Sequence, residues 1–184
     1  MVSTHVAVGV LIAVVLKTYF PELPTLPLLT SGFVGGALPD LDRYGTHRSD
    51  LHYPISGAVA TVLFGIVFLA YPSERAVSSV LLAGVGAFWV HSVMDIFDSP
   101  WRGAGKDKAV DNHFDGWFSP VQIVTFTQMG DWAIMIISFV VSFVVVVTRS
   151  AIFGEYIPRI LIGTIIIFVV ITSWYDLTHE KYNR

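Results

Sequence analysis

A short polar segment interrupts a chain that is otherwise almost purely apolar, and it concentrates the residues that could do chemistry. This segment, GGALPDLDRYGTHRSDLHYPISG at residues 35–57, contains three aspartates, two histidines and two arginines. A second group, His91 and Asp95, lies four positions apart in a later apolar run, and residues four apart share one face of a helix. Because neutral imidazole and carboxylate are ligands suited to Zn, Mn or Fe, the two groups together predict a metal site.

The chain has no cysteine, so thiol nucleophiles, disulfides and zinc ribbons are excluded. It also lacks a P-loop, an HExxH sequence and a nucleophile elbow. Ser92 adjoins His91, but neighbouring residues on a helix point in different directions, which disfavours a serine nucleophile. A formal net charge of -3 gives no indication of a nucleic-acid partner.

The composition indicates that helices in a lipid bilayer position these residues. Mean hydropathy is +0.67, and charged residues make up 14% of the chain, against roughly 25% in soluble domains. We therefore expect an all-α fold, a polytopic membrane helical bundle that forms one domain over residues 1–184. The predicted spans are 5–20, 26–39, 54–71, 77–97, 131–148 and 157–175, the first of them a retained helix and not a cleaved signal.

The second span is short for a bilayer crossing. Its 14 residues would extend only about 21 Å as a helix, against a hydrocarbon core of about 30 Å. A re-entrant segment is the alternative, since the glycines at 32, 35 and 36 would let other helices bury its backbone.

Alternating spans would place all six histidines at one side of the membrane: His5, His47, His52, His91, His113 and His179. A re-entrant second segment would separate His5 from Asp40, so the clustering favours a true span. The histidine side holds seven basic residues against four on the other, which predicts that the metal-site side is cytoplasmic. Each element also has a simpler interpretation: a helix end at LPDLD, a solvated loop at HRSDLH, and a private hydrogen bond between His91 and Asp95, that is, one that stabilises the bundle without a metal.

The segments THVAVG, GGALPDLD, HRSDLHYPISG, HSVMDIF and GWFSP occur in this order between residue 4 and about residue 118. In this order they resemble the successive motifs of a family of membrane-bound metal-dependent hydrolases, the YdjM-like proteins. That family is distantly similar to zinc-dependent phospholipase C. Two additional C-terminal spans, within 131–175, follow the region of resemblance.

The resemblance implies a primary site and a supporting group of residues. The primary site would contain His5, Asp40, His52, His91 and Asp95, with Asp42, His47 and Arg48 supporting it or facing the substrate. Two departures matter: the family often has HRG-x-T-H-S where this chain has HRSDLHYP, and no HxxxE follows HxxxD. Further ligands could come only from His113, Asp115, His179 and Glu180, which leaves the number of ions at one or two.

We therefore expect a metal-dependent hydrolase, a phosphoesterase acting on a phospholipid or another lipid-linked phosphate. The expected metal ligands are His5, Asp40, His47, His52, His91 and Asp95. Metal-activated water would attack phosphorus, Asp40 or Asp42 would accept a proton, and Arg48 would bind a phosphate oxygen. The alternatives are a transporter or ion pathway that uses the His/Asp cluster, and a membrane scaffold with a structural metal.

The polar connection at 98–130 mixes aromatic residues with charges, as interfacial segments do. We expect it either to cover the site as a lid or to be an ordinary interfacial loop. His113 within it would be exposed or, alternatively, a late metal ligand.

Overall fold

The structure is a computed structural model that describes residues 2–44, 48–97, 109–111, 113–114, 116–118, 128–154, 156–157, 162–163 and 170. Its α-helices are α1 (Val2–Tyr19), α2 (Thr25–Ala37), α3 (Pro54–Ala70), α4 (Arg75–Phe97), α5 (Gln128–Thr148) and α6 (Ser150–Phe153). Two 3-10 helices, η1 (Leu38–Tyr44) and η2 (Pro72–Glu74), precede the loop before α3 and the start of α4. The strands β1 (Val110–Asp111) and β2 (Trp117–Phe118) pair antiparallel.

The prediction of a mostly helical fold is confirmed, and the first five predicted spans coincide with α1 to α5. The small sheet was not predicted, because two-residue strands leave no periodic pattern in the sequence. The sixth predicted span, 157–175, lies mostly outside the described residues; α6 is a short helix that precedes it.

Prolines define the helix ends in the second half of the bundle. Pro54 begins α3, where its missing N–H is not needed and its fixed φ suits the first turn. Tyr71, at φ -122° and ψ 85°, ends α3 because the residue before a proline is disfavoured in helical geometry. At the end of α2, Pro39 coincides with the change from α-helix to 3-10 helix.

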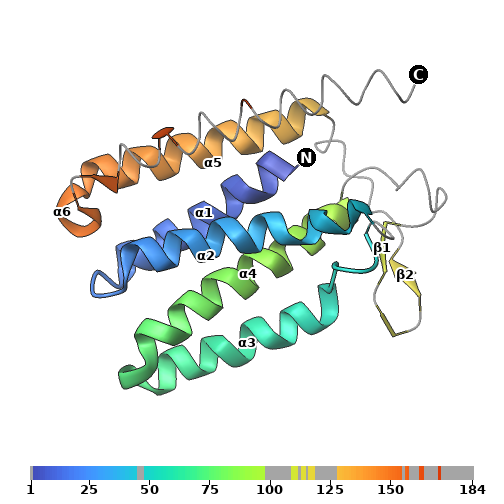
Figure 1. Ribbon diagram of the computed structural model, residues 1–184, viewed down its shortest axis with the longest axis horizontal. Coiled ribbons are helices and arrows are strands. Elements are labelled where there is room, and N and C mark those ends of the chain that lie inside the picture. The colour runs from blue at the N-terminus through green and yellow to red at the C-terminus, as the bar shows by residue number, and fades with distance from the viewer. Residues whose placement is uncertain are drawn as a thin grey trace.

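The long helices lie side by side and alternate in direction, so four chain segments meet at one end of the bundle (Figure 1). The start of α1, the end of α2, the start of α3 and the end of α4 all lie at the end that also carries β1 and β2. Because α2 runs antiparallel along α1, Asp40 lies at the same end of the bundle as His5. This is the arrangement expected if the segment 26–39 runs the full length of the bundle, whereas a re-entrant segment would turn back before reaching that end.

Small residues allow α1, α2 and α4 to pack closely. Gly9 of α1 and Gly32 of α2 face each other, and a Cβ on either glycine would collide with the other's carbonyl oxygen. Larger side chains fill the space further along: one cluster joins α1 to α5 and α6, and another joins the far ends of α1 to α4. At that far end, Lys17 donates hydrogen bonds to the carbonyls of Pro21 (2.5 Å) and Leu23 (2.6 Å), which ties down the α1–α2 turn.

Two helical segments of the described chain are long and apolar enough to cross a membrane, Val2–Tyr19 and Pro72–Phe97. The apolar helices Pro54–Ala70 and Ala133–Thr148 are shorter. By length and composition alone, core helices of soluble proteins and N-terminal signal sequences also meet this criterion, so membrane insertion stays a prediction.

Candidate metal centre

Five of the predicted ligands converge at the end of the bundle where α1, α2 and α4 meet. His5 comes from the first turns of α1, Asp40 from η1, and His52 from the loop just before α3. His91 and Asp95 come from the last turns of α4. All five side chains are buried, with His52 0% and His91 1% exposed.

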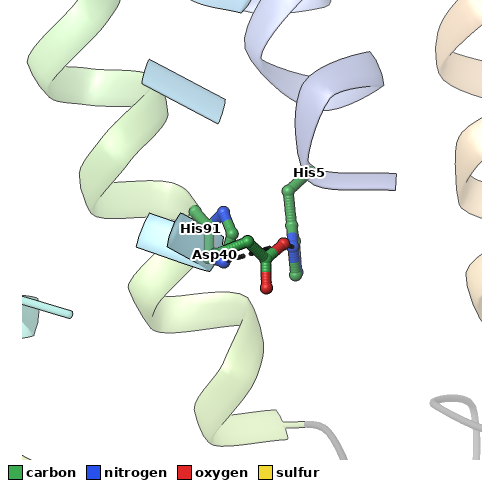
Figure 2. A group of neighbouring side chains, drawn as sticks. All are labelled: His5, Asp40 and His91. Atoms are coloured by element: carbon green, nitrogen blue, oxygen red, sulfur yellow. Dashed lines mark ion pairs between the residues drawn. The ribbon is translucent and has the colours of Figure 1, made fainter. Parts of the chain in front are cut away.

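The first group of ligand atoms joins His5, Asp40 and His91, which point toward one another from three different elements (Figure 2). Oδ2 of Asp40 lies 3.6 Å from Nδ1 of His5 and 3.8 Å from Nε2 of His91. The two imidazole rings are close, with centroids 3.6 Å apart. One ligand atom from each residue lies within 4.8 Å of the other two, so this group could hold a metal ion.

The second group joins His52, His91 and Asp95 and shares His91 with the first. Oδ2 of Asp95 lies 3.0 Å from Nε2 of His52 and 3.8 Å from Nε2 of His91. Its other oxygen, Oδ1, lies 3.3 Å from Nε2 of His5, so Asp95 spans both groups. Together the two groups are one contiguous cluster of three imidazoles and two carboxylates.

The spacing within this cluster fits ligands arranged around an ion better than direct hydrogen bonds. Ligand atoms about 2.0–2.2 Å from a tetrahedral ion lie roughly 3.3–3.6 Å from one another, whereas N–H···O bonds measure about 2.7–3.2 Å. Of the five His–Asp separations, two (3.3 and 3.6 Å) fall in the first range, two (both 3.8 Å) lie just beyond it, and the His52–Asp95 distance of 3.0 Å is that of a hydrogen bond. The 3.8 Å between His91 and Asp95 is too long for the private hydrogen bond that was the alternative.

A backbone contact orients the His91 ring for metal binding. Nδ1 of His91 donates to the carbonyl oxygen of Gly36 at 2.7 Å, which leaves the Nε2 lone pair directed at the cluster. In the part of the chain that the structure describes, Nε2 of His91 and Nδ1 of His5 are buried without a hydrogen-bond partner. Buried polar atoms are nearly always satisfied, so two such nitrogens in one cluster fit a missing ligand such as a cation.

The position of Gly36 makes this contact possible. A Cβ there would lie 2.6 Å from the His5 carbonyl oxygen and 2.9 Å from Cα of Val6, closer than real Cβ contacts. Glycine therefore lets the end of α2 approach α1 closely enough for its carbonyl to reach His91.

The electrostatic environment favours an ionised Asp40. Burial by itself would raise the pKa of the Asp40 carboxyl, but the His5 imidazole beside it and the nearby His91 lower it more. The net effect holds the pKa of Asp40 below its usual range, so the carboxylate is charged at neutral pH, as a metal ligand must be.

Arg48 is buried against the cluster. Its Nε lies 3.3 Å from Oδ2 of Asp95, and Nη1 donates to the Asp95 carbonyl at 3.4 Å. Its backbone adopts φ 62°, a conformation that side-chain-bearing residues rarely take, and its carbonyl accepts the Asp111 N–H at 2.9 Å. The guanidinium therefore compensates the charge of Asp95 directly, a role that its sequence position did not reveal.

The β1–β2 hairpin packs on the loop that carries Arg48 and His52. This contact was not predicted from the sequence. Ser49 Oγ donates to Oδ2 of Asp111 at 3.0 Å. Nε2 of His113 donates to the His52 carbonyl at 2.7 Å, and its ring stacks on Tyr53 with centroids 4.4 Å apart. His113 is exposed, as one of the two expectations had it, and it supports His52 from outside the cluster.

The other predicted site residues cannot be placed from this structure. The backbone of Asp42 lies in η1, but its side chain is outside what the structure describes, and His47, Asp115, His179 and Glu180 are outside it altogether. Most of the 98–130 connection is likewise outside the described residues, so its function as a lid stays a prediction.

Comparison with protein-family models gave no matching family, and searches of curated proteins and of solved structures gave no significant match. The resemblance to YdjM-like hydrolases therefore stays a prediction.

Proposed function

We propose that this chain is a membrane-embedded, metal-dependent hydrolase acting on phosphoesters of lipids, similar in reaction to phospholipase C. The observation that carries the proposal is the buried cluster in which two potential ligand groups share His91. Two of its imidazole nitrogens have no hydrogen-bond partner among the residues that the structure describes. Buried charges are normally paired or coordinate a metal, and Arg48 lies against one of the two carboxylates, that of Asp95.

Zn is the ion that we propose first, because imidazole and carboxylate together are the protein ligands of many catalytic zinc sites. Mn and Fe accept the same ligands, and the two groups allow one ion or two. Such an ion, when bound, supplies an activated water by lowering its pKa toward about 7. His5, Asp40 and His91 would hold one position, and His52, His91 and Asp95 the other.

The lowered pKa of Asp40 suits a metal ligand better than a proton acceptor, because a weakly basic carboxylate is a poor general base. We therefore assign Asp40 to the metal and keep Asp42 as the proposed proton acceptor. Arg48 would contribute a planar, permanently charged group to a phosphate oxygen while it compensates Asp95.

The outer face of α3 supports membrane insertion. Val59, Val62, Ile66 and Leu69 are 56%, 61%, 55% and 66% exposed, and such a helix in a soluble protein normally carries polar residues on its exposed face. With the helices across a bilayer, the cluster would lie near one surface, where lipid headgroups are. The excess of basic residues on the predicted histidine side supports a cytoplasmic location for the cluster.

The distribution of charge favours a one-sided site over a transport path. The described helices carry no ionisable side chain at residues 6–16, 25–37, 54–70 or 76–90, the stretches between the two ends of the bundle. A proton or metal pathway would need such groups at intermediate depth.

Metal content of the detergent-purified protein tests the proposal, measured by elemental mass spectrometry. We expect about one or two equivalents of Zn, Mn or Fe in the wild type and a loss of most of it in His91→Ala, which removes the ligand common to both groups. His113→Ala is the comparison variant, because it removes an imidazole at the same end that is not one of the cluster ligands, and it should lose far less metal than His91→Ala. Absence of metal in the wild type after incubation with divalent ions would refute the proposal and favour a transporter.

A further inference from the structure

An apolar furrow runs along the face formed by α2, α3 and α4. Its volume is about 430 Å³, which is within the usual range of ligand pockets. The lining includes Val34, Leu38, Ala60, Leu81 and Phe88, and its hydroxyl-bearing residues are Ser31, Ser56 and Tyr53. Ser31 already donates to the Val80 carbonyl at 2.6 Å, which leaves the furrow with little polarity to offer a ligand.

The furrow continues along α2 toward the far end of the bundle. A second hollow of about 470 Å³ shares Ser31 and Val34 with the first and extends to Leu26. From Leu26 to Leu38 the path follows the helix for roughly 18 Å, at 1.5 Å per residue. The two hollows together therefore make one long, apolar furrow that is open at the surface.

One end of this furrow adjoins the metal cluster. Leu38 lies two residues before Asp40, and Tyr53 follows His52 directly. Phe88 lies three residues before His91, one helical turn away on α4. A chain lying in the furrow would thus bring whatever is attached to its end up to the cluster and to Arg48.

We propose that the furrow binds one hydrocarbon chain of the lipid-linked substrate and so presents the attached phosphoester to the cluster. This inference rests on the proposed function, since it names how that site selects its substrate. An extended chain fits because the lining is mostly apolar and the furrow is open at the surface, with Val34 in its lining 48% exposed. Moving a hydrocarbon chain from the bilayer into the furrow yields little hydrophobic free energy, because both surroundings are apolar. The furrow would therefore contribute by positioning and orienting the attached phosphoester.

Cross-linking tests this proposal without requiring hydrolysis. The probe is a lysophosphatidylcholine that carries a diazirine near the end of its single acyl chain, added to protein in lipid nanodiscs. We expect the labelled peptides to be those of α2 from Leu26 to Val34, with little label on the outer face of α3. Equal labelling of α2 and of the outer face of α3 would overturn the proposal. So would label found only on peptides outside the furrow, which is the result expected if another helix fills the furrow.

Two neighbouring positions on α3 provide a blocking variant and its matched control. Ala60→Phe places a ring inside the furrow and should lower the labelling of α2 about fivefold or more, because overpacking a filled cavity is unfavourable. Val59→Phe adds the same ring on the outer face, where Val59 is 56% exposed, and should leave the labelling unchanged. A symmetric gel-filtration peak in detergent reports that each variant is folded, and Ala60→Leu serves if the larger ring prevents folding.

The failure of the furrow and the failure of the proposed function are distinguishable. Labelling of α2 in a protein without metal or hydrolysis would refute the proposed function and keep the chain-binding site. Normal metal content with labelling that Ala60→Phe does not change would refute the furrow alone.

Discussion

Replacing Gly36 with alanine tests whether close packing of α1 and α2 controls the metal site. The added Cβ would lie 2.6 Å from the His5 carbonyl oxygen, and ordinary contact begins near 3.4 Å, so the helices must separate by about 0.8 Å. That displacement acts on two ligands at once, because Gly36 also accepts the hydrogen bond from Nδ1 of His91.

The size of the effect follows from the tolerance of metal sites. Ligand distances are held to within about 0.2 Å, so a movement of 0.8 Å is well beyond what the site can absorb. Loss of a hydrogen-bond partner behind a metal-binding histidine typically lowers metal affinity by about 10–100-fold. We expect Gly36→Ala to weaken Zn binding by about this factor, with a lower melting temperature from the strained helix contact.

A competition titration against a chromophoric zinc chelator would measure the affinity, with thermal unfolding followed in parallel. The matched control is Gly65→Ala, because a Cβ at Gly65 meets only Leu82 Cδ1 at 4.0 Å. That variant should keep its affinity and be stabilised by up to about 1 kcal/mol through helix propensity. Wild-type zinc affinity in Gly36→Ala would show that the α1–α2 contact does not set the geometry of the cluster.

Two further predictions concern charged groups of the cluster. Arg48→Lys should keep the metal but lower hydrolysis of a phosphodiester such as bis(p-nitrophenyl) phosphate by about 100-fold, the cost typical of losing one oriented donor in the transition state; undiminished turnover would remove Arg48 from the proposed site. In metal-free protein, the pKa of Asp40 is lower in the folded state than in the unfolded chain. Its ionisation therefore stabilises the fold at pH values above the ordinary carboxyl pKa of about 3.9. This contribution to stability is lost as the pH falls from there toward the folded-state pKa. The difference in melting temperature between wild type and Asp40→Asn should therefore be largest near neutral pH and shrink below about pH 4, and a difference that does not change with pH would contradict the assigned charge.

Local sequence determined the helices of this protein. Apolar runs of sufficient length predict α1 to α5, and the expected bounds differ from the observed ones by at most three residues. Pro54 and the Tyr71–Pro72 pair mark the beginning and end of α3 because proline acts on its immediate neighbours. Residue types also predicted a metal site, since an imidazole or carboxylate in an apolar chain needs a partner, whereas the choice of the five converging residues came from the resemblance.

Only the tertiary structure decided how those ligands meet. His5, Asp40 and His91 are separated by 35 and 51 positions, and their distances depend on how closely whole helices approach one another. The contact of the Gly36 carbonyl with His91, the pairing of Arg48 with Asp95, and the hairpin on the His52 loop all join segments far apart in the chain. Neighbouring residues determine whether a helix forms, whereas side-chain packing between helices determines where its end lies to within the fraction of an ångström that a metal site requires.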